Sequence, residues 1–231
     1  SFMGTHLEKE IKALEGVLNN PNKPVAAIIG GSKVSTKIDV INFLLKKMDI
    51  IIIGGAMANT FVAAKGLDVG KSLFEKECID LAKELIEKSQ NNNCNLILPT
   101  DFIVSKNLKK HAEYTTANFD SLPHNMMALD IGPKSIELIN KNINNCKTIL
   151  WNGPLGAFET YPFDKGTNKV ASHVSSLTKQ KKILSVAGGG DTVSALNNAK
   201  VLNDFSYVST AGGAFLEWLE GKVLPGIEPI S

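Results

Sequence analysis

The sequence contains no arginine: all 25 of its basic residues are lysine. Arginine is the side chain that binds carboxylates and phosphates in a bidentate fashion. An acidic ligand must therefore be held here by lysine, by backbone N–H groups, by a metal ion or by another domain. The 23 acidic residues leave a net charge of only +2, and this balance argues against a dedicated nucleic-acid-binding protein.

Cysteine and long apolar runs are also scarce. Cys78, Cys94 and Cys146 are far apart and form no CxxC pair, which argues against a disulfide scaffold or a zinc site and favours a reducing, cytoplasmic location. No apolar run reaches the roughly 20 residues of a membrane span. The chain opens at Ser1 without a secretory signal or an initiator methionine, so we expect a processed chain or a piece of a longer one.

Six short apolar runs, each followed by glycine or a turn, predict strands that are buried on both faces. They are Val25–Ile29, Asp49–Ile53, Asn95–Leu98, Thr148–Trp151, Ile183–Val186 and Tyr207–Ser209. Helical patterns lie between them at 7–18, 38–48, 57–65 and 74–88, and another begins at Pro133. This alternation predicts an α/β fold in a single domain: a doubly wound, mostly parallel six-stranded sheet with helices on both faces, in three αβα layers.

Two local features carry their own predictions. Ser72 and Glu75 have the spacing of a capping box for the helix at 74–88. The polar stretch 104–125 shows no clear period, and we expect a surface hairpin or an irregular loop there.

Glycine-rich turns follow five of the six expected strands. They are Gly30-Gly31, Gly54-Gly55, Asn152–Gly156, Gly188–Thr192 and Ser209–Gly213. In an open parallel sheet these turns share one edge, where ligands bind. Glycine lets the backbone approach a ligand closely, and helix N-termini present free N–H groups to anions. The pattern indicates a phosphate-bearing ligand, most simply a nucleotide.

Two familiar phosphate motifs are nearly present, but neither fits. Gly66–Ser72 has three residues between its glycines where a P-loop needs four, and it follows a helical pattern rather than a strand. Gly188–Gly190 lacks the third glycine of a dinucleotide fingerprint, and no acidic residue ends a following strand to bind a ribose. This pattern argues against a Rossmann dehydrogenase.

Lys33 and Lys37 are spaced i and i+4 at the expected start of the helix after the first strand. Two cations on one face at the positive end of a helix dipole are unfavourable unless an anion binds there. The alternative is that both are solvated and only their stems cover apolar surface. Asp191, after three glycines, could be a helix cap or a Mg²⁺ ligand. Glu159 could bind ribose hydroxyls or be an exposed loop acid.

Taken together, several segments resemble the nucleotide-binding, C-terminal half of phosphoglycerate kinase, in that family's order and spacing from about Phe2 to Pro229. They are Gly30–Lys37, Gly54–Phe61, Trp151–Glu159, Gly188–Thr192, Ser209–Ala214 and Glu220–Gly226. The resemblance implies one nucleotide-binding domain over residues 1–231, without the arginine-rich lobe that binds 3-phosphoglycerate. It implies reversible phosphoryl transfer between ATP and the carboxylate of 3-phosphoglycerate, giving ADP and 1,3-bisphosphoglycerate in glycolysis and gluconeogenesis. The alternative is a standalone nucleotide-binding module without catalysis.

The resemblance also implies a role for each site residue. Those expected to act in catalysis are Lys33, Lys37, Gly190 and Gly213. Those expected to bind ATP or ADP are Lys37, Gly55, Ala56, Ala128, Leu129, Asn152, Gly153, Leu155, Phe158, Glu159, Gly189, Gly190, Asp191, Thr192 and Gly212, with Asp191 also holding Mg²⁺.

The resemblance further implies a monomer that binds neither nucleic acid nor membrane. Nucleotide binding without turnover is expected of this chain by itself, because a lone lobe cannot close over its ligand. Ala56 and Ala128 stand where the family often has glycine beside the adenine, so their methyl groups could tighten or crowd that pocket, and Ala211 replaces the first of three glycines in the family pattern.

Overall fold

A computed structural model describes residues 12–222 of the chain. Its centre is a six-stranded, fully parallel sheet with the strand order β3-β2-β1-β7-β8-β9. The strands are β1 (Val25–Ile29), β2 (Ile50–Ile53), β3 (Asn95–Ile97), β7 (Thr148–Asn152), β8 (Leu184–Gly188) and β9 (Tyr207–Ser209). All six strands that the sequence predicts are therefore present, within two residues at each end.

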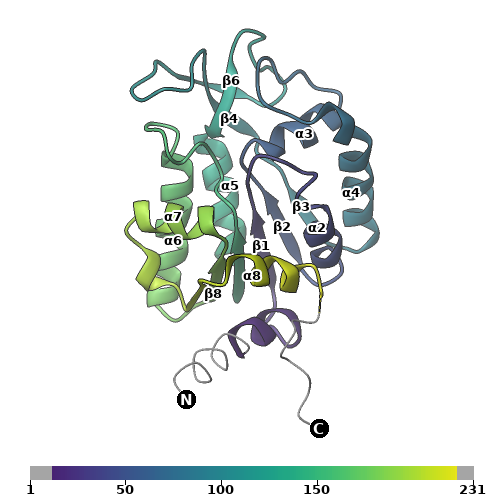
Figure 1. The fold of residues 1–231 in the computed structure, drawn as a ribbon, viewed down its shortest axis with the longest axis vertical. Coiled ribbons are helices and arrows are strands. Elements are labelled where there is room, and N and C mark those ends of the chain that lie inside the picture. The colour runs from purple at the N-terminus through teal and green to yellow at the C-terminus, as the bar shows by residue number, and fades with distance from the viewer. Residues whose placement is uncertain (1–11, 223–231) are drawn as a thin grey trace.

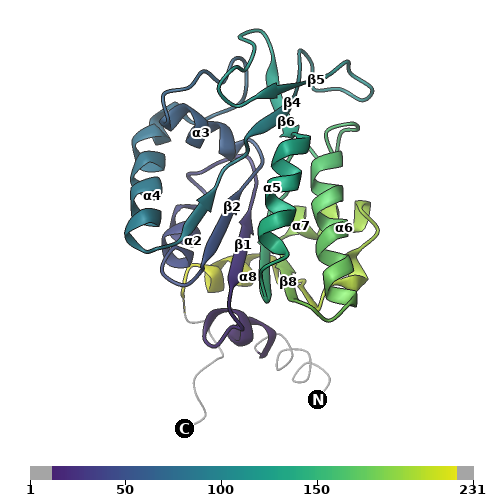
Figure 2. The same cartoon turned by 180° about the vertical axis from the view of Figure 1, so that it is seen from behind.

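Helices cover both faces of this sheet (Figures 1 and 2). One face carries the helical residues 12–18 together with α2 (Ile38–Leu44), α3 (Met57–Ala64), α4 (Ile79–Asn91) and α8 (Gly212–Leu219). The other face carries α5 (Pro133–Ile143), α6 (Lys165–Lys179) and α7 (Gly190–Asn198). The three-layer αβα prediction is confirmed. No helix in the described part of the chain is long and apolar enough to cross a membrane.

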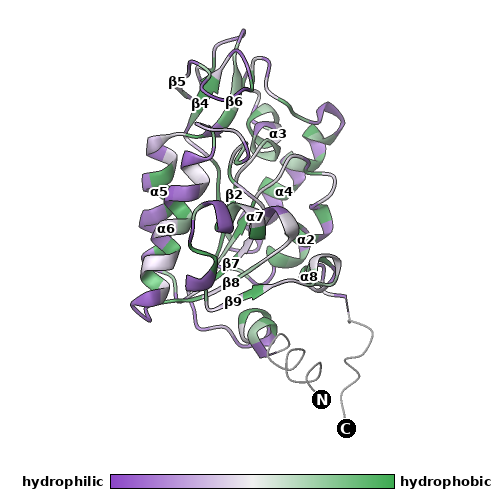
Figure 3. Cartoon of the chain, turned by 60° about the vertical axis from the view of Figure 1, so that its left-hand side comes forward, coloured by the Kyte–Doolittle hydropathy of each residue, from purple (hydrophilic) through white to green (hydrophobic). Residues whose placement is uncertain are grey.

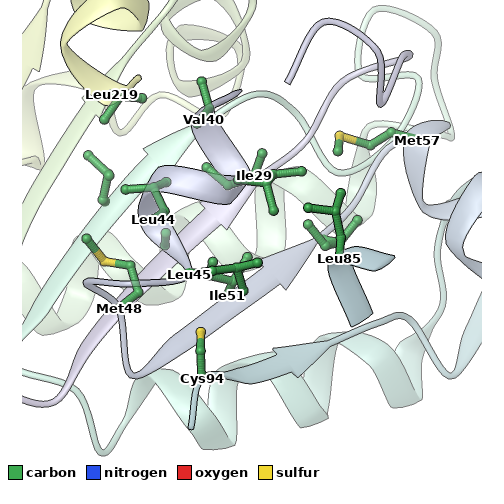
Figure 4. Close-up of a cluster of buried hydrophobic side chains, with 14 of the residues drawn as sticks. Ile29, Val40, Leu44, Leu45, Met48, Ile51, Met57, Leu85, Cys94 and Leu219 are labelled. Carbon is green, nitrogen blue, oxygen red and sulfur yellow. The ribbon is translucent and has the colours of Figure 1, made fainter. Parts of the chain in front are cut away.

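Alternating side chains of each strand feed two separate cores. In β1, Val25, Ala27 and Ile29 pack among the helices of the first face, whereas Ala26 and Ile28 pack against those of the second. Figure 4 shows part of the first core, where Ile29 meets residues of α2. The helices that cover the sheet turn a stripe of apolar residues toward these cores. For this reason α5 and α6 carry both apolar and hydrophilic residues (Figure 3).

The three cysteines are buried and free, in agreement with the absence of a disulfide pattern. Burial raises the pKa of Cys94 and of Cys146 to about 11. Their thiolates are therefore scarce at neutral pH, and both side chains act as small apolar residues of the core.

A second sheet stands at the edge of the first and was only partly predicted. It is antiparallel with the order β5-β4-β6, formed by β4 (Asp101–Ser105), β5 (Thr115–Asn118) and β6 (Met127–Ile131). The hairpin expected within 104–125 exists as β4 and β5, but it begins before that stretch, since only the last two residues of β4 fall inside it, and β6 was missed. Its five residues bury Asp130 together with apolar side chains and therefore show no clear alternation.

One predicted helix start was wrong, and another lies outside the described residues. The helix expected from residue 74 begins as the short 3₁₀ turn η1 (Lys76–Cys78) and continues as α4. Ser72 and Glu75 form no capping box, because the Ser72 hydroxyl accepts from the Ala128 N–H and Glu75 binds Ser35. At the N-terminal helix, residues 7–11 lie outside the described residues, and 12–18 are helical as predicted.

Candidate functional site

The loops after β1, β2 and β7 touch one another through their backbones. A Cβ atom on Gly30 would lie 2.0 Å from the carbonyl oxygen of Pro154, and one on Gly153 would lie 2.2 Å from that of Gly30. Gly55 has a φ of +70°, and its Cβ would lie 2.4 Å from the Gly31 oxygen. Glycine at these positions therefore serves close packing of loop against loop, which the sequence interpretation assigned only to ligand approach.

Two adjoining cavities open at this edge of the sheet. The first, about 350 Å³, has mainly apolar walls, and the second, about 260 Å³, is lined by polar groups and glycine. Gly31, Ser32, Pro154 and Asp191 line both. A ligand with an apolar end and a polar end could therefore occupy the two at once.

The apolar cavity gathers seven of the residues expected to bind the nucleotide. They are Gly55, Ala56, Ala128, Leu129, Phe158, Glu159 and Asp191. Leu73 and Leu108, which are 60% and 52% exposed, add walls that sequence reasoning missed. They come from polar loops, where single leucines gave no signal. The cavity suits a planar ring, with the Glu159 carboxylate available for hydroxyl groups.

The polar cavity is built around Lys37. Its ammonium donates to Oδ1 of Asn152, and the Asn152 amide nitrogen is fixed by a 2.8 Å hydrogen bond to the Gly188 oxygen. Burial lowers the pKa of Lys37, and the charges of Asp191 and Glu220 partly oppose that shift. Lys37 forms no ion pair within residues 12–222. A half-buried cation without a carboxylate partner fits an anionic ligand.

The N-terminus of α7 forms another part of the wall of the polar cavity. Gly189, with a φ of +96°, precedes the helix, and a Cβ on Gly190 would have no heavy atom within 4 Å. The first N–H groups of a helix have no partner within the helix, so this open end can receive phosphate oxygens. The hydroxyl of Thr192 accepts from the Gly153 N–H at 2.7 Å and so ties α7 to the loop after β7.

Asp191 is exposed in the first turn of α7 and lines both cavities. The described residues contain no group of three or more His, Cys, Asp or Glu side chains that could hold a metal by themselves. Mg²⁺ is commonly held by one or two carboxylates together with substrate phosphates and water. One hard carboxylate beside a phosphate-sized cavity fits that donor set.

Four expected site residues lie outside both cavities. Lys33 is exposed in the loop before α2, and Lys37 is the residue that precedes this helix, so the two lysines do not share a helical face as predicted. Leu155 is buried in the second core. Gly212 and Gly213 open α8 as expected, but Leu216 is the residue of this helix that lines the polar cavity.

Comparison with known proteins gives one consistent family. The family model described as phosphoglycerate kinase matches residues 1–222. Phosphoglycerate kinase of Sinorhizobium fredii is 51% identical over 99% of this chain and 57% of its own length. That of Brucella melitensis is 53% identical over 99% of this chain and 58% of its own. The chain thus spans a little more than half the length of these relatives.

Solved structures agree with the sequence matches. Phosphoglycerate kinase from Coxiella burnetii superposes with a TM-score of 0.90 at 45% identity, covering 94% of this chain and 56% of that one. The enzyme from Pyrococcus horikoshii gives a TM-score of 0.80 at 27% identity, covering 95% and 54%.

Proposed function

Because this chain belongs to the phosphoglycerate kinase family, we propose that residues 1–231 form its nucleotide-binding lobe. In the whole enzyme this lobe would serve phosphoryl transfer between ATP and the carboxylate of 3-phosphoglycerate. The observation that carries the proposal is the junction of the two cavities. An apolar space of adenine size meets a polar space that holds Lys37 and the N-terminus of α7.

The two cavities suggest how the nucleotide is held. The base would lie between the β6 side, at Ala128, and Phe158, with the ribose at Glu159. The phosphates would enter the polar cavity and meet the Lys37 ammonium and the N–H groups of Gly190 and Asp191. These contacts fix the position of the terminal phosphoryl group before it reacts.

Phosphoryl transfer depends on positioning and on stabilising spread negative charge rather than on covalent chemistry by the protein. Lys37 supplies a positive charge that burial leaves poorly solvated, so its interaction with developing charge is strong. Since the substrate carboxylate is the nucleophile, no side chain of this lobe needs to attack. Mg²⁺, held by Asp191 and the nucleotide, would neutralise phosphate charge.

Calorimetric titration with nucleotide tests the proposal. We expect residues 1–231 to bind ADP and ATP, with Mg²⁺ strengthening the binding of ATP. Asp191→Ala should remove the Mg²⁺-dependent part because it removes the carboxylate beside the phosphates.

The matched control is Asp80→Ala, which removes an exposed acid from the first turn of another helix, α4. It should keep the full Mg²⁺ dependence. Binding of neither nucleotide by the parent chain would refute the nucleotide site, whereas an unchanged Mg²⁺ effect in Asp191→Ala would refute only the role of Asp191.

A further inference from the structure

Asp130 is a buried carboxylate directly behind the wall of the apolar cavity. It lies on β6 and is 2% exposed, and the three residues before it, Met127, Ala128 and Leu129, line the cavity. Its Oδ2 accepts from the Gly166 N–H at 2.6 Å, and its Oδ1 accepts from the Ile131 N–H at 2.9 Å. The carboxylate therefore joins β6 to the first turn of α6.

The loop 156–160 forms a second wall of the same cavity and lies against this carboxylate. The loop 156–160 lines the cavity with every one of its residues, and the Ala157 N–H bonds to the Leu129 oxygen at 2.8 Å. A Cβ on Gly156 would lie 2.2 Å from Asp130 Oδ1, and one on Gly166 would lie 2.4 Å from the same atom. Loop and helix thus approach the carboxylate so closely that only glycine fits.

The environment makes this contact costly to disturb. Burial raises the pKa of Asp130, with a smaller contribution from Asp164, while the two backbone N–H bonds and Lys169 act in the opposite direction. An asparagine at this position would keep the shape but would turn an amide N–H₂ toward a backbone N–H. Two donors would then face each other inside the protein, where the side chain is only 2% exposed.

We propose that Asp130 is a positioning residue for nucleotide binding: its carboxylate holds β6, the loop 156–160 and the start of α6 at the separation that fits the base. The inference rests on the proposed function, since it assumes that the apolar cavity takes the base. It concerns only the base end of the ligand and leaves the polar cavity unchanged.

Asp101 offers a matched control within the same sheet. It lies on β4, is 1% exposed, and caps α5 by accepting from the N–H groups of Lys134 at 3.0 Å and Ser135 at 2.7 Å. No residue of β4 lines either cavity. Asp101→Asn therefore disturbs an equally buried helix cap without touching the cavity wall.

The experiment compares Asp130→Asn and Asp101→Asn by titration with ADP and with pyrophosphate, alongside urea unfolding. Both substitutions should lower the unfolding midpoint. Asp130→Asn should weaken ADP binding about tenfold, because the displaced cavity wall would no longer fit the base, and should leave pyrophosphate binding unchanged. Asp101→Asn should change neither affinity by more than about twofold.

The outcomes separate this inference from the function on which it rests. A parent chain that does not bind ADP overturns the proposed function as well. A parent chain that binds ADP, together with an Asp130→Asn variant of equal affinity, overturns the positioning role alone, as does an equal loss in Asp101→Asn.

If Asp130→Asn does not fold, Gly156→Ala provides the same test, because its methyl group would push the loop away from the carboxylate. The same selective loss of ADP binding is expected. An unchanged ADP affinity in the folded Gly156→Ala variant would overturn the proposal.

Discussion

Lys37 sits where its charge costs stability in the absence of a ligand. Burial lowers the pKa of its ammonium from 10.5, so the folded chain holds this proton less firmly than the unfolded chain does. We therefore predict that Lys37→Met, which keeps the apolar stem, raises the melting temperature of the ligand-free chain at neutral pH by about 2–4 °C. The same change should weaken ADP binding sharply, because the phosphates lose their cation.

The pH dependence provides an internal check on this prediction. A pKa lowered by folding means that the unfolded state binds more protons as pH approaches 10.5, so the parent chain gains stability there. The advantage of Lys37→Met should therefore be greatest near neutral pH and shrink toward pH 10.5. A variant that melts below the parent chain at neutral pH would show that the ammonium stabilises the fold instead.

At single positions, the sequence was better at picking out residues that line the cavities than at giving the reason why they lie there. Lys37 was expected at an anion site because it would share a helical face with Lys33, yet Lys37 only precedes α2 and Lys33 is exposed outside both cavities. That a residue lies just after a strand end can be predicted correctly even when the expected helix start is wrong by a few residues, whereas the helical face on which it lies cannot. Leu73 could not be predicted, because its place depends on how a loop folds back onto the site.

At the scale of elements, the glycines at the carboxyl edge divide into two kinds. A Cβ on Gly30 would collide with the Pro154 oxygen at 2.0 Å, whereas Gly190 has open space around its missing Cβ and an ordinary backbone conformation at the start of α7. The first kind packs loops together, and the second leaves room in the polar cavity.

Alanine substitution should separate the two kinds. Gly190→Ala should leave the chain as stable as the parent or more stable by about 0.5 kcal/mol, since alanine favours a helix, and should still weaken ADP binding because its methyl group occupies the phosphate space. Gly30→Ala should lose about 1–3 kcal/mol or more through overpacking. Urea unfolding and ADP titration of both variants provide the measurement, and equal ADP affinity of Gly190→Ala and the parent chain would contradict the expected phosphate position.

The parallel strands were predictable because each is an almost unbroken apolar run. β1 buries all five of its residues, and a run of that kind fits a strand between two layers of helices.

The antiparallel sheet was not predictable in the same way. β5 has three exposed residues out of four, and β6 places Asp130 in the interior. Tertiary contacts, not periodicity, set these strands, and β6 is the one that completes the apolar cavity.

At the scale of the whole molecule, the described residues form the two cavities of the proposed nucleotide site but little that would cover them. Leu73 and Leu108, which line the apolar cavity, are 60% and 52% exposed, so this part of the cavity wall faces solvent. Phosphoryl transfer to an acceptor other than water needs that water to be excluded. The chain also has no arginine with which to bind a phosphorylated acid in bidentate fashion.

Residues 1–231 alone should therefore bind ADP and yet show no measurable transfer of phosphoryl groups between ATP and 3-phosphoglycerate. A full-length relative such as the Sinorhizobium fredii enzyme, of which this chain matches 57%, serves as the positive control in the same coupled assay. The physical reason is that a lone lobe positions one reactant and leaves the other in solution, so the advantage of holding both in line is lost. Turnover by this chain approaching that of the full-length relative would mean that acceptor binding and water exclusion reside within these residues, and the assignment of both to the rest of the enzyme would have to be abandoned.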